Sequence, residues 1–166
     1  MWLHATHTEK RAQSSSNRMS IVDAKTRSRL MSGIRSKNTK PELTLRSFLH
    51  SRGFRFRLHA SSLPGRPDLV LAKYKLCIFV NGCFWHRHPG CKFATMPKSN
   101  TDFWQEKFSA NIRRDTQVML QLQIQGWRVF RIWECGLRNA DASALEMLTH
   151  LIKGDIGQLD WPDCIL

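Results

Sequence analysis

The spacing of hydrophobic and polar positions alternates along the chain between helical and strand-like patterns. From Thr39 to Gly53, apolar residues recur at helical spacing after a capping threonine and an early proline, and the glycine ends the pattern. Residues 54–58 alternate apolar with basic side chains, which predicts a half-exposed strand. Two apolar runs, 68–72 and 76–80, then follow a turn-forming segment and predict a hairpin near the centre of a sheet.

The second half of the chain continues with longer elements. Asp102 is expected to cap a long helix over 103–125, which Gly126 ends. A strand over 127–133 and a final helix over 142–153 complete the pattern. This order of elements predicts an α/β or α+β domain, in which helices flank a mixed central sheet.

The N-terminal segment has a different composition from the rest. Residues 1–20 are polar, serine-rich and basic, so we expect a disordered arm followed by a single domain over 21–166. Residues 23–36 suit a short basic helix or a hooked segment. No apolar run approaches the roughly 20 residues that span a bilayer, and no signal-peptide pattern is present. We therefore expect a cytoplasmic protein with no membrane partner.

The charge of the chain is strongly positive and unevenly distributed. Lys and Arg total 26 against 13 Asp and Glu, a formal net charge of +13. Residues 1–66 hold 14 of these basic residues and only 3 of the acidic ones. Such an excess attracts phosphate polymers through counterion release. Nucleic acid is the favoured partner, because no segment combines basic residues with the apolar stripe of a membrane-surface helix.

A cysteine- and histidine-rich loop, VNGCFWHRHPGCKF, follows the predicted hairpin. Cys83, His88 and Cys91 offer three ligands within nine residues, and His86 competes with His88 on spacing alone. A closed tetrahedral zinc site needs a fourth ligand, for which Cys135 is the first candidate and Cys164 the second. Four protein ligands would make the zinc structural. The alternative is that these thiols are simply buried, as expected of Cys77 within its apolar run.

An aspartate at the start of a predicted strand suggests a second, harder metal site. Asp68 follows the turn GRP, where a carboxylate can bind a divalent cation or only cap the turn. Glu42 on the preceding helix and a second strand nearby resemble the arrangement of Mg²⁺ nucleases. That second strand carries no acid or lysine, so His86 is the nearest group for acid–base chemistry.

Three motifs together resemble the very short patch repair DNA mismatch endonucleases: SLPGRPDLVLAKYKLCIFVNGCFWHRHPGCKF, FWQEKFSANIRRD and GWRVFRIWECGL. The likeness runs from about Asp23 to Leu137. It implies a restriction-endonuclease-like fold and a monomeric, nucleoid-associated enzyme. Such enzymes nick double-stranded DNA 5′ of the thymine in a T·G mismatch, left by deamination of 5-methylcytosine. Partners in mismatch repair or cytosine methylation are not readable from the sequence.

The resemblance also implies a role for individual residues. Asp68 and the backbone carbonyl of Val80 would bind Mg²⁺, His86 would be the general base, and Glu42 would support the site. The structural zinc would be bound by Cys83, His88, Cys91 and Cys135. Met31, Phe84 and Trp85 would form an intercalating wedge. Lys107 and Asn111 would contact the mismatched pair.

The chain departs from the family pattern at three places. Val80 replaces a common threonine, Asn81 replaces a histidine seen in some members, and the segment between His88 and Cys91 has one more residue than in some relatives. Two other functions stay open: a non-catalytic, zinc-containing DNA-binding module, and a nuclease of the same fold without mismatch preference.

The adjacent Phe84 and Trp85 admit two interpretations. An aromatic ring inserted between base steps costs a few kcal/mol of unstacking, and the cost is lowest at a mismatch. Insertion can therefore select poorly stacked sites. Alternatively, both rings form the core of the zinc loop.

Overall fold

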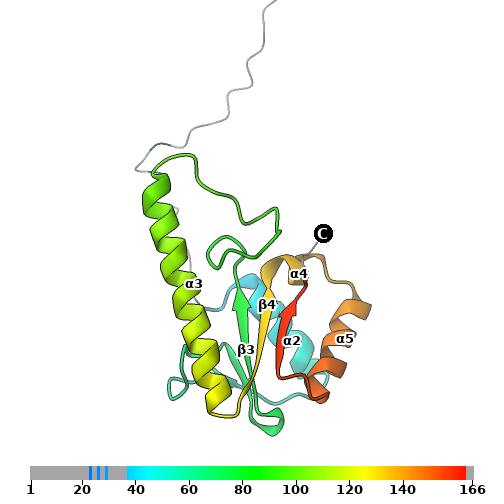
Figure 1. The fold of residues 1–166 in the computed structure, drawn as a ribbon. Helices are drawn as coiled ribbons and strands as arrows, with labels where there is room; N and C mark the ends of the chain where they lie inside the picture. Colours follow the sequence, from blue (N-terminus) through cyan, green and yellow to red (C-terminus); the bar gives the residue numbers. More distant parts are fainter. Residues whose placement is uncertain (1–22, 24–25, 27–28, 30–36, 164–166) are drawn as a thin grey trace, which may run out of the picture. The chain divides into compact units, whose positions relative to one another are not determined.

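A mixed five-stranded sheet, in the order β1-β2-β3-β4-β5, organises residues 37–163 (Figure 1). This computed structural model describes residues 23, 26, 29 and 37–163. Antiparallel pairing joins β1, β2 and β3, and parallel pairing joins β3, β4 and β5. The predicted mixed sheet and its hairpin are thus confirmed. The strands are Arg57–Leu58, Leu69–Leu71, Leu76–Asn81, Arg128–Trp133 and Gln158–Trp161.

Alternate residues of the strands face two different apolar clusters. One cluster joins the sheet to α2 (Lys40–Ser51), α4 (Glu134–Asn139) and α5 (Ala142–Lys153). The other packs α3 (Thr101–Ile124) against Val70, Cys77 and Val129. Because side chains alternate between faces along a strand, α3 covers one face of the sheet and α2 and α5 the other. Cys77 is fully buried, as its apolar run predicted.

Helix α2 begins where its sequence specifies a start. The Thr39 hydroxyl accepts the N–H of Glu42, and the Glu42 carboxylate accepts the N–H of Thr39, which is a complete capping box. This cap also fixes Glu42 in the first turn of α2, where its side chain is only 2% exposed. The local sequence therefore positions one carboxylate of the candidate active site.

The start of α3 differs from the prediction. Asn100, in a left-handed conformation with φ of 55°, precedes the helix, and Asp102 lies inside the first turn. Asparagine tolerates this backbone better than most residues, so the helix begins earlier than the aspartate suggested. Gly126, with φ of 76°, ends the helix as predicted.

Three other features differ from the sequence pattern. The strand predicted over 54–58 pairs only at Arg57 and Leu58, because Phe54 turns into the core and is 3% exposed. Helix α4 and strand β5 had not been predicted.

Met31 and the arm predicted over 1–20 lie outside the described residues, and so does Cys164.

The parallel pairing of β3 with β4 places two functional segments at one end of the sheet. Asn81 lies opposite Trp133 in the register, so the cysteine-rich loop after β3 meets α4 directly after β4. None of the described helices combines the length and the hydrophobicity needed to traverse a bilayer.

Candidate active site and metal centre

Three cysteines and one histidine converge between the loop and α4. The ligand atoms of Cys83, His88, Cys91 and Cys135 all lie within 4.8 Å of one another. His88 Nδ1 is 3.7 Å from Cys83 Sγ and 3.3 Å from Cys135 Sγ. Zinc bonds of about 2.3 Å to sulfur and about 2.0 Å to nitrogen place tetrahedral ligands about 3.5 Å apart. The observed spacing therefore fits zinc.

The ring of His88 is held in the orientation that a metal would need. Its Nε2 lies 3.1 Å from the carbonyl oxygen of Pro162, which can only accept a hydrogen bond. Nε2 therefore carries the proton, and the lone pair of Nδ1 faces the sulfur atoms. The ring also stacks on Trp133, with centroids 4.2 Å apart. Burial lowers the pKa of His88, which favours the neutral imidazole that binds metals.

The thiols of this cluster are poorly suited to exist as isolated anions. Burial raises the pKa of Cys83 to about 11, and burial also raises that of Cys135. Without a cation, both thiols would stay protonated at neutral pH. A bound metal ion would reverse this preference, so metal uptake would release protons.

The backbone of the loop is folded by turns rather than by apolar packing. The N–H of His88 donates to the Cys83 carbonyl at 3.1 Å, and the N–H of Cys91 donates to the His88 carbonyl at 3.3 Å. Gly90 adopts a φ of 67°, which glycine reaches without strain. The segment between His88 and Cys91 is thus folded as a turn. Glu134 Oε1 on α4 accepts the Cys83 N–H at 3.1 Å.

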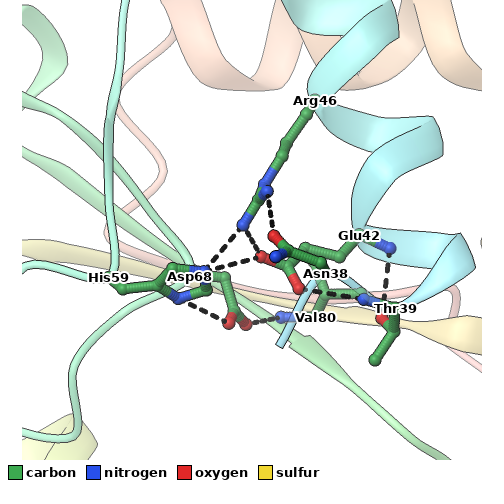
Figure 2. A network of polar contacts seen from close by, with 7 residues as sticks. All are labelled: Asn38, Thr39, Glu42, Arg46, His59, Asp68 and Val80. Atoms are coloured by element: carbon green, nitrogen blue, oxygen red, sulfur yellow. Dashed lines mark hydrogen bonds and ion pairs between the residues drawn. The ribbon is translucent and has the colours of Figure 1, made fainter. Parts of the chain in front are cut away.

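A second polar network joins α2 to the start of β2 (Figure 2). Asp68 Oδ2 accepts the N–H of Val80 at 2.8 Å, so the two predicted magnesium ligands are neighbours. Arg46 forms an ion pair with Glu42, and its Nη1 donates to Asn38 Oδ1 at 2.7 Å. The network therefore connects the carboxylates of two separate elements.

His59 lies between these carboxylates, and sequence reasoning had assigned it no function. Its Nε2 is 2.8 Å from Arg46 Nη2 and 3.3 Å from Glu42 Oε1, and its Nδ1 is 3.7 Å from Asp68 Oδ1. The ligand atoms of Glu42, His59 and Asp68 all lie within 4.8 Å of one another. His59 has a φ of 47°, a conformation that no sequence pattern around it indicates.

The electrostatics of this network suit a cation. Burial raises the pKa of Asp68, against the opposing effects of the Val80 N–H, Arg46 and His86. Burial, followed by the charge of Arg46, lowers the pKa of His59 and favours its neutral form. In the network, two carboxylates then face one guanidinium, which leaves a net negative charge. Carboxylate oxygens are the ligands preferred by Mg²⁺.

His86 lies outside the cysteine cluster and bonds to α3 instead. Its Nδ1 is 2.5 Å from Asp115 Oδ2. A carboxylate can only accept, so Nδ1 carries the proton and Nε2 keeps a lone pair for another proton. A cavity of about 250 Å³ opens beside this pair, with Asn81, Arg114 and Arg131 in its wall.

Asp115 is a functional candidate that sequence reasoning missed, although a signal was present. Lys107, Asn111 and Asp115 recur every four residues, which places them on one face of α3. Two of the three had been predicted to contact DNA. The third shares their face and contacts the candidate base.

The predicted wedge residues form part of an aromatic cluster. The Phe84 ring makes edge-to-face contacts with Trp85, Trp104 and Phe108, at centroid distances of 5.1, 5.5 and 5.2 Å. Phe84 and Trp85 are nevertheless half-buried rather than enclosed. Lys107 Nζ lies 5.9 Å from the centroid of the Trp85 ring.

Asn111 is engaged within the chain rather than free. Its Nδ2 donates to the Trp85 carbonyl at 3.0 Å, and its Oδ1 accepts from Arg114 at 2.8 Å. In this arrangement Asn111 supports the backbone of the aromatic loop. Contact with a base through Nδ2 or Oδ1 would require one of these hydrogen bonds to be exchanged or shared.

The sequence is similar to those of DNA endonucleases. Residues 19–92 match the family described as DNA mismatch endonuclease Vsr. The type II nicking enzyme V.XorIIP of Xanthomonas oryzae pv. oryzae is 50% identical over 117 residues, which cover 70% of this chain and 84% of that protein. DNA mismatch endonuclease Vsr of Escherichia coli is 42% identical over 133 residues, or 80% and 85% of the two chains. Among solved structures, the catalytic domain of homing endonuclease I-Bth0305I aligns with a TM-score of 0.46 and 20% identity, covering 70% of this chain and 97% of that one.

Proposed function

The chain belongs to the Vsr family of DNA mismatch endonucleases, and from this premise we propose that it nicks one strand of DNA 5′ of the thymine in a T·G mismatch. The family membership makes it a DNA endonuclease. The proposed substrate is double-stranded DNA in which 5-methylcytosine has been deaminated, bound by a monomer. The observation that carries the proposal is the network of buried Glu42 and half-buried Asp68, which a DNA-binding module without catalysis would not need.

The proposed mechanism assigns hydrolysis to the side chains around Asp68. Asp68 and the Val80 carbonyl would hold Mg²⁺, with Glu42 in support. A bound Mg²⁺ would stabilise charge on the phosphate oxygens and on the leaving oxygen. The lone pair of His86 Nε2 takes a proton from the attacking water. Asp115 keeps the ring in this tautomer and stabilises the imidazolium that forms.

The cysteine cluster is proposed to bind a structural zinc. Four protein ligands would leave no open position for water, so this metal would not enter the reaction. Its effect would be to fix the loop that carries His86 and the aromatic pair. Metal binding and catalysis would then be linked through the geometry of one loop.

His86→Ala is expected to slow nicking by about 10²–10⁴-fold, the usual contribution of a positioned general base. The variant should keep its zinc, because His86 is outside the cysteine cluster. Single-turnover nicking and metal content measure the two effects, with the exposed His50→Ala on α2 as the matched control. Loss of zinc in His86→Ala, with retention in His88→Ala, would show that the two histidines have exchanged roles.

Trp85→Ala is expected to weaken discrimination of T·G from T·A while largely sparing the fold. Stacking of a base on an aromatic ring contributes about 1–3 kcal/mol, which the variant would lose. Because Trp85 is half-buried, the variant should lose clearly less unfolding free energy than the about 3–5 kcal/mol lost when a core tryptophan is truncated. Competition binding and thermal unfolding are the measurements. A variant that melts far lower yet still discriminates would assign Trp85 to the core.

Binding and nicking of one T·G duplex, measured with Mg²⁺ present and omitted, test the proposed function. We expect binding in both conditions and nicking only with Mg²⁺. Binding without nicking in either condition would favour the non-catalytic module instead.

A further inference from the structure

The network in Figure 2 contains one side chain that the proposed mechanism leaves unused. His59 lies between Glu42 and Asp68, with one ring nitrogen facing each carboxylate. It is mostly buried, with 18% of its side chain exposed. A neutral imidazole in this position is a strong metal ligand as well as a hydrogen-bonding group.

The distances around His59 suit coordination of one ion. Ligands that bind one cation at about 2.0–2.3 Å lie about 3–4.5 Å from one another. His59 Nε2 is 3.3 Å from Glu42 Oε1, and one ligand atom each from Glu42, His59 and Asp68 lies within 4.8 Å of the other two. The backbone holds this arrangement, since the N–H of His59 donates to the carbonyl of Asp68 at 3.3 Å.

In the structure, Arg46 lies where such an ion would bind, because its Nη2 is 2.8 Å from His59 Nε2. Its Nη2 faces both Glu42 and His59 Nε2, whereas its Nη1 is bonded separately to Asn38. A divalent cation could therefore replace Nη2 between Glu42 and His59, while Arg46 stays attached to Asn38.

We infer that His59 is a further protein ligand of the catalytic cation, through Nε2, alongside Asp68, the Val80 carbonyl and the supporting Glu42. The inference rests on the proposed function, in which Asp68 binds this cation. Imidazole favours borderline transition metals over Mg²⁺, whereas an all-oxygen site favours hard cations. The site should consequently accept Co²⁺ more readily than an all-oxygen site would.

Competition between Co²⁺ and Mg²⁺, measured calorimetrically on the full chain with zinc already bound, tests the inference. His59→Gln keeps a polar side chain but removes the imidazole, and His50→Gln, at an exposed position on α2, is the matched control. We expect His59→Gln to lower Co²⁺ affinity by about 10–100-fold, the scale of changes around metal ligands, with a much smaller effect on Mg²⁺. His50→Gln should change neither. Zinc content is measured before and after, so that Co²⁺ entering the cysteine cluster is detected.

A second measurement does not depend on a folded variant. In the Co²⁺-loaded wild type, the proton NMR spectrum should contain a strongly shifted, exchangeable imidazole N–H signal, because Nδ1 keeps its proton. Its absence, or an unchanged Co²⁺ preference in a folded His59→Gln, would overturn the inference. Asp68→Asn should abolish Co²⁺ binding, which would show that the ion binds at this network and not in the cysteine cluster. A His59-dependent Co²⁺ site in a chain that does not nick T·G DNA would overturn only the proposed function.

Discussion

Asp68→Asn is expected to reduce nicking by roughly 10³-fold or more, the scale on which lost electrostatic stabilisation of a transition state is measured. The substitution keeps the shape of the side chain and an oxygen for the Val80 N–H, but it removes the charge that would hold the cation. Binding of the T·G duplex should stay nearly unchanged, because Asp68 is mostly buried and has been assigned no contact to DNA. Single-turnover nicking and duplex affinity are the two measurements.

The control for this variant is Asp155→Asn, at an exposed position between α5 and β5. It removes the same charge from the chain without touching the network around Asp68. Both functions should be retained in the control. Cleavage at the wild-type rate by Asp68→Asn would refute the active site proposed here.

Cys135→Ser is expected to lose zinc and to unfold at a much lower temperature than the wild type. Structural zinc contributes about 10–16 kcal/mol of apparent binding free energy, which is comparable to or larger than the about 5–15 kcal/mol net stability of a domain. Cys135 also lies where α4 meets the loop, so its loss would release both segments. Metal analysis and thermal unfolding measure the outcome.

Cys164→Ser is the matched control, because Cys164 was the second candidate for the fourth zinc ligand. It should retain zinc and the wild-type unfolding temperature. The opposite result, zinc lost from Cys164→Ser and kept in Cys135→Ser, would show that Cys164 and not Cys135 is the fourth ligand. Absence of zinc from the purified wild type would refute the proposed zinc site.

Local signals in the sequence were sufficient for the elements that begin and end by capping. The capping box of Thr39 and Glu42 specified α2, and the predicted bounds of α5 agree with those observed. The hairpin of β2 and β3 was equally accessible, because its two apolar runs are joined by a short turn. These features depend on residues close together in the chain.

Features that depend on distant residues were not predicted. Strand β5 exists through parallel pairing with β4, and its four residues carry no strong pattern. The same strand brings Pro162 to His88, a contact across 74 positions that completes the setting of the metal centre. No local rule of the sequence could indicate this contact.

In the two polar sites, too, the features set by nearby residues were predicted and most of those that depend on distant residues were not. The spacing of cysteines and histidines indicated a candidate metal site, whereas the choice of His88 over His86 came from the resemblance. In the structure, His88 lies among the three cysteines and His86 lies beside Asp115. His59 was missed, since its left-handed backbone and its distance from Glu42 have no sequence signature. Asp115 could have been found from its helical spacing with Asn111.

Strand-specific nicking of matched T·G and T·A duplexes tests the central claim most directly. Each strand carries its own end label, the flanking sequence is varied, and products are mapped to single nucleotides in the presence of Mg²⁺. The proposal predicts one nick, 5′ of the mismatched thymine, in the T·G duplex and none in the T·A duplex. Equal cleavage of both duplexes, or cleavage of both strands, would contradict it.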